Sequence, residues 1–291
     1  MFKAPLRASV TIAAMVVVLI LGLVLGLVLG NTAFSNHGTH AAANSNSPTS
    51  KPAPVASVTI PQDQELFDPF VVPVQLNTTV TWHNNDTILH TVETTPDQTP
   101  FLNIQSFTLT IPAGKSASFT FTKPGLYHYY DNTVAKWDTA TSRVAANKSV
   151  PNYPLAMDGV IWVQGFIGDL PSGSTNHIPA SHDDFATEFV AITDIGTVSF
   201  HNFDTDPHFV ALVPDLSAPL NPGEIGINRI GGTDDVPGGE TITIIFSKPG
   251  LYYYYCANHA LVNKDWHRAQ AFKQASEYPI PMEGFILVVG K

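Results

Sequence analysis

Cysteine is nearly absent from this sequence, with Cys256 as the only one among 291 residues. A single thiol excludes an intrachain disulfide and any zinc site built from several cysteines. Charge is also sparse, because charged residues make up 13% of the chain and acidic residues outnumber basic ones by 24 to 14. The net charge of −10 leaves no basic stripe for phosphates, so we expect no nucleic acid among the partners.

One long apolar run stands apart from the otherwise short hydrophobic segments. Residues 8–30 carry no charge, and Lys3 and Arg7 precede them. At ~1.5 Å per residue this run is long enough to span a ~30 Å hydrocarbon core. The basic residues before it predict that the rest of the chain lies on the extracytoplasmic side. We expect 1–30 to be a single-pass anchor in the cell membrane; a cleaved signal segment, which would make the protein secreted, is the alternative.

The first 54 residues contain a glycine pattern that bears on dimerisation and a segment that we expect to be a flexible linker. Gly22, Gly26 and Gly30 recur every four residues, a small-residue face that favours a homodimer of membrane helices. Residues 31–54 are polar, small and proline-bearing, without apolar periodicity, so we expect a flexible linker there.

The rest of the chain contains an internal repeat. Three blocks recur in the same order, at offsets of 118, 125 and 125: 81–92 with 199–210, 121–132 with 246–257, and 153–163 with 278–288. Each copy is long enough to be a complete domain. We therefore predict one domain at 55–167, a linker at 168–183 and a second domain at 184–291.

Short strands bounded by turns dominate both copies. The 23 prolines and 20 glycines are spread between Val-, Ile-, Thr- and Tyr-rich runs, which is typical of an all-β protein. Residues 80–82 and 198–200 look like core strands, as do 118–122 and 241–246. Only the inserts near 135–150 and 260–277 leave room for a helix. The fold class that these patterns predict is a β-sandwich in each half.

Four side chains of the second copy could bind a metal. His208 follows a strand, Cys256 ends a Tyr-rich strand, His259 follows it as Cys-x2-His, and Met282 opens the last strand. Soft sulfur stabilises Cu(I), imidazole suits both oxidation states of copper, and a weak axial thioether tunes the potential. A structural cysteine with unrelated loop histidines is the alternative.

This pattern resembles the plastocyanin-like cupredoxins. N-x-D-x3-H, then Y-Y-C-x2-H, then M-x-G before a Val-rich strand are the motifs that carry the resemblance, which covers both copies. It implies two tandem cupredoxin-like Greek-key sandwiches and one blue, type 1 copper per chain. The implied ligands are His208, Cys256 and His259, with Met282 as the weak axial one. It also implies that His259 is the electron port and that Ala260, Leu261 and Val262 join an apolar docking rim. Between His259 and Met282 lie 22 residues, more than in small family members.

The first copy keeps only half of the set. His90 and Met157 keep their places, but Asp131 stands where the second copy has its cysteine, and Val134 where it has its second histidine. Without a thiolate no blue copper site can form, so we predict a domain that lacks a complete site.

The resulting prediction is a membrane-tethered blue copper electron carrier whose partners are redox proteins, themselves membrane-bound. One alternative is an enzyme, a two-domain multicopper oxidase or nitrite-reductase-like protein with another copper between the domains. Such enzymes carry histidine before the cysteine, whereas this chain has Tyr255. A second alternative is a cell-surface binding or copper-storage module without electron transfer. His83, His128 and His201 are expected to make surface or interface hydrogen bonds. No catalytic triad, phosphate-binding glycine loop or paired catalytic carboxylates emerge from the spacing.

Overall fold

The computed structural model describes residues 54–96, 105–213, 218–219, 227–230 and 235–290. The predicted anchor, 1–30, and all of the predicted linker except Pro54 lie outside these residues. Within them the backbone forms strands, turns and bends, and no helix is long and apolar enough to cross a membrane. The described part is all-β, as the strand patterns predict.

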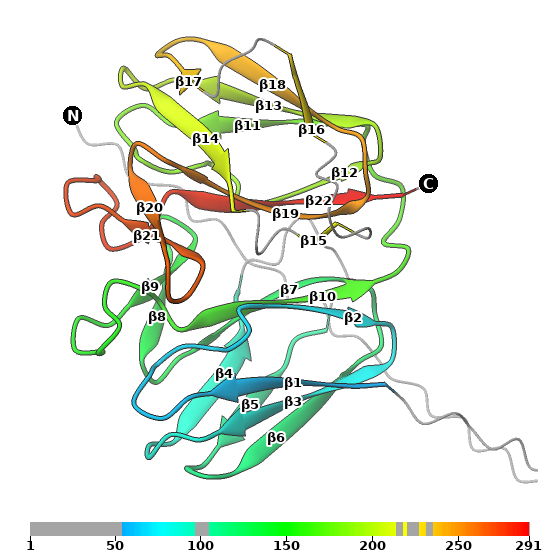
Figure 1. Ribbon diagram of the computed structural model, residues 1–291, viewed down its shortest axis with the longest axis vertical. Coiled ribbons are helices and arrows are strands. Elements are labelled where there is room, and N and C mark those ends of the chain that lie inside the picture. Colours follow the sequence, from blue (N-terminus) through cyan, green and yellow to red (C-terminus); the bar gives the residue numbers. More distant parts are fainter. Residues whose placement is uncertain (1–53, 97–104, 214–217, 220–226, 231–234, 291) are drawn as a thin grey trace, which may run out of the picture. The chain divides into compact units, whose positions relative to one another are not determined.

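The N-terminal half contains two sheets and a hairpin, drawn in blue to green in Figure 1. Its strands are β1 (Val55–Ile60), β2 (Val71–Gln75), β3 (Thr78–Asn84), β4 (His90–Thr94), β5 (Thr108–Ile111), β6 (Ser116–Phe121), β7 (Gly125–Asp131), β8 (Ala135–Asp138), β9 (Arg143–Ala146) and β10 (Asp158–Gln164). One sheet has the order β1-β3-β6 and the other β2-β10-β7-β4-β5, while β8 pairs with β9.

The C-terminal half repeats this plan. Its strands are β11 (Gly173–Ile178), β12 (Phe189–Thr193), β13 (Gly196–Asn202), β14 (His208–Leu212), β15 (Ala218–Pro219), β16 (Ile227–Ile230), β17 (Asp235–Val236), β18 (Thr241–Phe246), β19 (Gly250–Cys256), β20 (Ala260–Asn263), β21 (Arg268–Ala271) and β22 (Glu283–Val289). The sheet orders are β11-β13-β18-β16 and β12-β22-β19-β14-β17, with β15 paired to β19 and β20 to β21.

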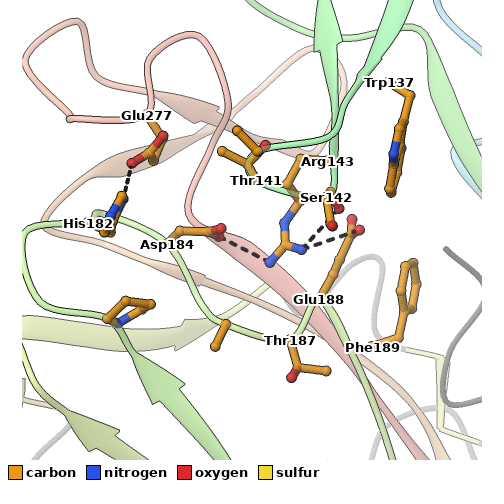
Figure 2. A pocket seen from close by; sticks show the side chains of 13 residues that line it. Trp137, Thr141, Ser142, Arg143, His182, Asp184, Thr187, Glu188, Phe189 and Glu277 are labelled. Atoms are coloured by element: carbon orange, nitrogen blue, oxygen red, sulfur yellow. Dashed lines mark hydrogen bonds and ion pairs between the residues drawn. The ribbon is translucent and has the colours of Figure 1, made fainter. Parts of the chain in front are cut away.

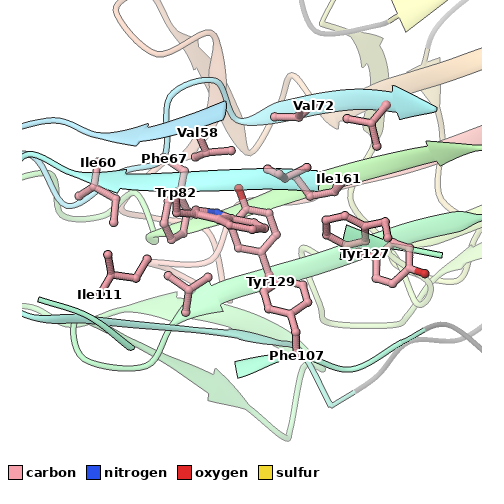
Figure 3. Packing of buried hydrophobic residues seen from close by; sticks show 14 of the residues in the cluster. Val58, Ile60, Phe67, Val72, Trp82, Phe107, Ile111, Tyr127, Tyr129 and Ile161 are labelled. Atoms are coloured by element: carbon pink, nitrogen blue, oxygen red, sulfur yellow. The ribbon is translucent and has the colours of Figure 1, made fainter. Parts of the chain in front are cut away.

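Each half has its own aromatic core. In β3 alternate residues are buried, so Val80 and Trp82 face inward while His83 is exposed. Figure 3 shows Trp82 beside Tyr129 of the opposite sheet, and their rings lie edge to face at a centroid distance of 5.5 Å. In the second half Phe200 and Tyr254 form the equivalent pair at 5.3 Å. Burial of such rings contributes about 1.5–3 kcal/mol each to holding the two sheets together.

The strand registers repeat as well. Asp158 of β10 lies opposite Tyr130 of β7, and Glu283 of β22 lies opposite Tyr255 of β19. Each residue of the second pair lies 125 positions after its counterpart in the first pair, so the repeat in the sequence is also a repeat in the structure.

The segment 168–183, which the sequence predicts to be a linker, contains a strand of the second sandwich. β11 pairs in parallel with β13, as β1 does with β3. The composition of β11, rich in Gly, Ser, Thr and Asn, resembles that of a linker. The reason is that one face of this edge strand is exposed and carries polar residues. On the other face Asn176 is buried, and its amide donates to the carbonyl of Thr187 and to the hydroxyl of Tyr254.

The inserts at 135–150 and 260–277 are hairpins instead of helices. Each turns at a residue with left-handed backbone, Ser142 at φ 53° and His267 at φ 54°. In the second hairpin the amide of His267 donates to the carbonyl of Asn263 at 2.8 Å, which closes the turn.

A third apolar cluster joins the two halves. Strands β7 and β10 are buried on both faces, and so are β19 and β22 for most of their length. Their second faces meet, with Val160 and Trp162 in one cluster with Phe285 and Leu287. The ring of Phe285 stacks on that of Phe189 at 5.2 Å. Ala260 and Ala269 of the second insert pack into the same cluster.

Candidate metal centre

Strand ends of the second sandwich bring three potential ligands together. Cys256 is the last residue of β19, His208 is the first of β14, and His259 lies in the turn after β19. The amide of His259 donates to the carbonyl of Cys256 at 3.2 Å, and the amide of Ala257 donates to the carbonyl of Phe209 at 2.9 Å. These bonds fix the Cys-x2-His turn against the start of β14.

The three ligand atoms converge on one point. Sγ of Cys256 lies 3.7 Å from Nδ1 of His208 and 3.4 Å from Nδ1 of His259. The two imidazole rings are 4.7 Å apart between centroids. One ligand atom from each of the three residues lies within 4.8 Å of the others. This spacing leaves the three atoms close enough to share one metal ion.

The sulfur is buried and has one backbone donor. The amide of Phe209 donates to Sγ of Cys256 at 3.3 Å. Burial raises the pKa of the Cys256 thiol, and the backbone amides of Phe209, Asn258 and His259 oppose that shift. In the metal-free protein the thiol is therefore protonated near neutral pH, and a bound cation would displace that proton.

Carboxylates lie at the far side of both imidazoles. Nε2 of His208 is 3.5 Å from Asp204, and Nε2 of His259 is 3.1 Å from Oδ1 of Asp183. Burial, and next the neighbouring His259, lower the pKa of His208, which favours the neutral ring that a metal requires. With Nε2 directed to a carboxylate, each ring turns Nδ1 toward the sulfur.

The N-x-D-x3-H motif forms the loop that carries His208. The side-chain amide of Asn202 donates to the carbonyls of Asp206 and Val236, and its oxygen accepts from the amide of Asp204. Asn202 is fully buried, so it holds both ends of the loop at once.

Met282 lies beside this group. It is 1% exposed and belongs to the same apolar cluster as Cys256. Its carbonyl accepts from the amide of Cys256 at 2.9 Å, which ties the start of β22 to the end of β19. The 22-residue insert before it folds as the β20–β21 hairpin and leaves this tie intact.

The first sandwich has an ion pair at the equivalent place. Nδ1 of His90 lies 2.6 Å from Asp131, and Nε2 lies 3.3 Å from Asp86. Burial alone would lower the pKa of His90, but the carboxylates of Asp131 and Asp86 together outweigh it and the pKa is raised. The amide of Asp131 donates to the carbonyl of Met157, as Cys256 does to Met282. A carboxylate and one imidazole thus fill the position that a thiol and two imidazoles occupy in the second half.

His83, His128 and His201 make the surface and interface contacts expected of them. His83 bonds Ser116 and His201 bonds Thr241, both at the surface, while buried His128 lies 2.8 Å from Asp158. Two groups of three or more metal-binding side chains occur among the described residues, and both contain His208. Neither group includes His83, His128 or His201.

The surface near His259 is only partly apolar. The His259 side chain is 14% exposed, against 0% for Cys256 and His208. Of the three residues expected in an apolar rim, Leu261 is exposed and Val262 is half-buried, but Ala260 is buried. Ala260 packs instead into the cluster between the two halves, because it begins strand β20.

A cavity of about 450 Å³ lies near this site, between the β8–β9 turn and the segment that precedes β12 (Figure 2). Arg143, Asp184 and Glu188 line it, together with Trp137 and Phe189. The sequence motifs did not indicate these charged residues. The one available signal was the 125-residue offset, which relates Arg143 to Arg268.

No protein-family model and no curated protein sequence matches the chain. Solved structures similar to part of it are cupredoxins, the family that the motifs resemble. A purple cupredoxin from Nitrosopumilus maritimus is 18% identical, over 38% of this chain and 99% of its own, with a TM-score of 0.25. A methionine-to-alanine mutant of amicyanin in the Cu(I) form is 20% identical, over 38% and 82% of the two chains, with a TM-score of 0.27.

Proposed function

We propose that the protein is an extracytoplasmic electron carrier, tethered to the membrane by its N-terminal segment, with one type 1 copper in the C-terminal sandwich. The ligands in this proposal are His208, Cys256 and His259, with Met282 as the weak axial ligand. The convergence of one sulfur and two Nδ1 atoms at a buried strand end is the observation that carries it.

The donor set fits copper better than zinc or a hard cation. One thiolate, two imidazoles and a nearby thioether form the soft, mixed set that accepts both Cu(I) and Cu(II). The first sandwich lacks the thiolate, so the proposal assigns it no copper. Bound copper would supply a reversible one-electron couple.

The surrounding residues restrict the motion of the ligands and shield them from water. β19 pairs with both β22 and β14, so Cys256 is held between two neighbouring strands. The amide of Phe209 donates to Sγ of Cys256, and the side-chain amide of Asn202 donates to the carbonyl of Val236, so the loop of His208 is fixed at both points. Ligands that move little between charge states keep the reorganisation cost of electron transfer low. His259, the most exposed of the four, is the edge through which electrons would enter and leave.

The membrane tether would determine which partners the carrier meets. A linker of residues 31–54 confines the sandwiches near the bilayer and raises their effective concentration there. Redox proteins of the same membrane are the partners that we propose, and Gly22, Gly26 and Gly30 would support a homodimer.

The test uses the full chain, purified in detergent and loaded with copper. We expect one copper per chain, an intense thiolate-to-copper absorption and a reversible one-electron couple. Cys256→Ser should abolish the absorption, while His201→Ala, which removes an imidazole outside the group, should preserve it. An absorption that survives Cys256→Ser, or is missing from the unaltered protein, would contradict the proposal. Two coppers per chain would favour the multicopper enzyme instead.

A further inference from the structure

Two buried arginines occupy equivalent places in the two halves. Arg143 begins β9 and Arg268 begins β21, 125 residues apart, and their side chains are 4% and 4% exposed. Each reaches from its own hairpin into the other half of the molecule. Buried guanidinium groups need several partners, so their contacts show what each hairpin holds.

Arg143 holds the segment that precedes β12. Its Nη2 donates to Oδ1 of Asp184 at 3.1 Å and to the carbonyl of Phe185 at 2.7 Å. Its Nη1 lies 3.7 Å from Oε2 of Glu188. Figure 2 shows the guanidinium between these two carboxylates.

The acidic partners of Arg143 have no counterpart in the first half. The residues equivalent to Asp184 and Glu188, at the offset of 118, are Leu66 and Phe70. Arg268 accordingly makes other contacts. It donates to the carbonyl of Ala156 and to Asp158, and it lies 3.9 Å above the ring of Phe70. The two halves therefore also differ at the segment that Arg143 holds.

That segment also contacts the metal centre. Asp183, the residue before Asp184, places Oδ1 3.1 Å from Nε2 of His259. Its second oxygen accepts from the amide of Ser276 at 2.6 Å. The amide of Asp183 in turn donates to the hydroxyl of Ser276 at 2.8 Å. The insert thus fixes Asp183 on one side, and Arg143 fixes the next two residues, Asp184 and Phe185, on the other.

We propose that the N-terminal sandwich serves to position the metal centre of the C-terminal one. In this arrangement, which rests on the proposed copper site, Arg143 fixes segment 184–188 and thereby Asp183, and Asp183 orients the ring of His259. Asp183 and Arg143 are positioning residues in this proposal, because neither belongs to the proposed ligand set of His208, Cys256, His259 and Met282. A negative charge beside a ligand stabilises Cu(II) over Cu(I). The first sandwich, though it lacks a thiolate, would then set the potential of the second.

The experiment measures the potential of the copper-loaded full chain in matched variants. Asp183→Asn keeps the shape and removes the charge, and it should weaken Cu(II) binding relative to Cu(I) about tenfold. That corresponds to a potential about 59 mV higher for a one-electron couple. Arg143→Lys keeps the charge but loses the two-pronged guanidinium group that bonds Asp184 and Phe185. We expect it to weaken Cu(II) binding relative to Cu(I) about threefold, in the same direction as Asp183→Asn. The potential of the double variant should change by less than the sum of the changes in the two single variants, because both act through Asp183.

Arg268→Lys is the control, because it changes an equally buried arginine whose contacts lie away from Asp183. It should leave the potential and the thiolate absorption unchanged. If Arg143→Lys does not fold, Asp184→Asn tests the same link and should shift the potential upward. The inference is overturned if Asp183→Asn has no effect, or if Arg268→Lys shifts the potential as much as Arg143→Lys. An unaltered protein without the thiolate absorption would instead refute the copper site itself.

Discussion

The two sandwiches share a scaffold and differ at the end of one strand. In both halves a histidine begins the fourth strand, and the residue that ends the Tyr-rich strand donates its amide to a methionine carbonyl. In the first half that residue is Asp131, which pairs with His90, and in the second it is Cys256. The comparison teaches that the scaffold tolerates either a buried ion pair or a thiolate–imidazole group, and that a few side chains determine which forms.

The largest effect should come from making the second site resemble the first. Cys256→Asp removes the thiolate and leaves a carboxylate beside His208, as Asp131 lies beside His90. We expect the absorption to vanish and copper affinity to fall by more than the roughly 100-fold that loss of an outer hydrogen bond costs. Titration with Cu(II) checks this, and retained tight binding would contradict the ligand assignment.

The converse change should give the first sandwich a site. Asp131→Cys with Val134→His supplies the two missing ligands next to His90, at positions where the strand pairing is already equivalent. We expect the copper content to rise from one to two per chain, with a stronger thiolate absorption. Asp131→Cys alone is the control and should bind the second copper more weakly, for want of the second imidazole. An unchanged copper content would show that the two ends differ in more than their ligands.

Loss of the buried ion pair should cost stability. Asp131→Asn leaves a fully buried His90 without its main counter-charge, which typically costs about 3–5 kcal/mol of unfolding free energy. Because the pKa of His90 is raised, the pair contributes fully below the unfolded pKa of about 6.5, and its contribution falls as pH rises through the folded pKa. Asp86, also beside His90, remains in the variant.

Chemical denaturation at a series of pH values measures this difference. The difference in unfolding free energy between the unaltered protein and Asp131→Asn should be largest below pH 6.5 and should become small in alkaline solution. His83→Gln, which changes an exposed ring, should leave stability unchanged. A gap that widens with rising pH would mean that His90 is neutral in the fold.

The smallest effect should come from Met282→Leu. The change preserves volume in a buried position, so the fold should remain and copper should still bind. Loss of a weak axial thioether should alter the potential and the visible spectrum without abolishing either. Voltammetry of the two proteins side by side measures the shift, and no change in either property would remove Met282 from the ligand set.

Much of this arrangement could be predicted from sequence, because its signals are local or repeated. Cys256 and His259 are three residues apart in a turn, so their proximity follows from the chain. The repeat predicted two halves, and residues 80–82 and 198–200, predicted as core strands, contain the buried Trp82 and Phe200. The contact between His208 and Cys256 spans 48 residues. Only the family resemblance indicated it.

What could not be predicted depends on contacts between distant segments. Asp183 lies in a polar stretch that looks like a linker, and nothing local indicates that it reaches His259. The hairpins at 135–150 and 260–277 were ambiguous because each is short and is stabilised by the opposite half. Arg143 and Arg268 look like surface residues, since a lone arginine is usually exposed.

The reciprocal arginines have a consequence for how such a molecule arises. When two hairpins of the same design each insert a cation into the other half, the contact is of the isologous kind that two identical subunits form about a twofold axis. Joining the subunits in one polypeptide frees their association from protein concentration. It also frees each copy to diverge, so the acidic segment 183–188 and the Cys256 group can be kept on one side alone.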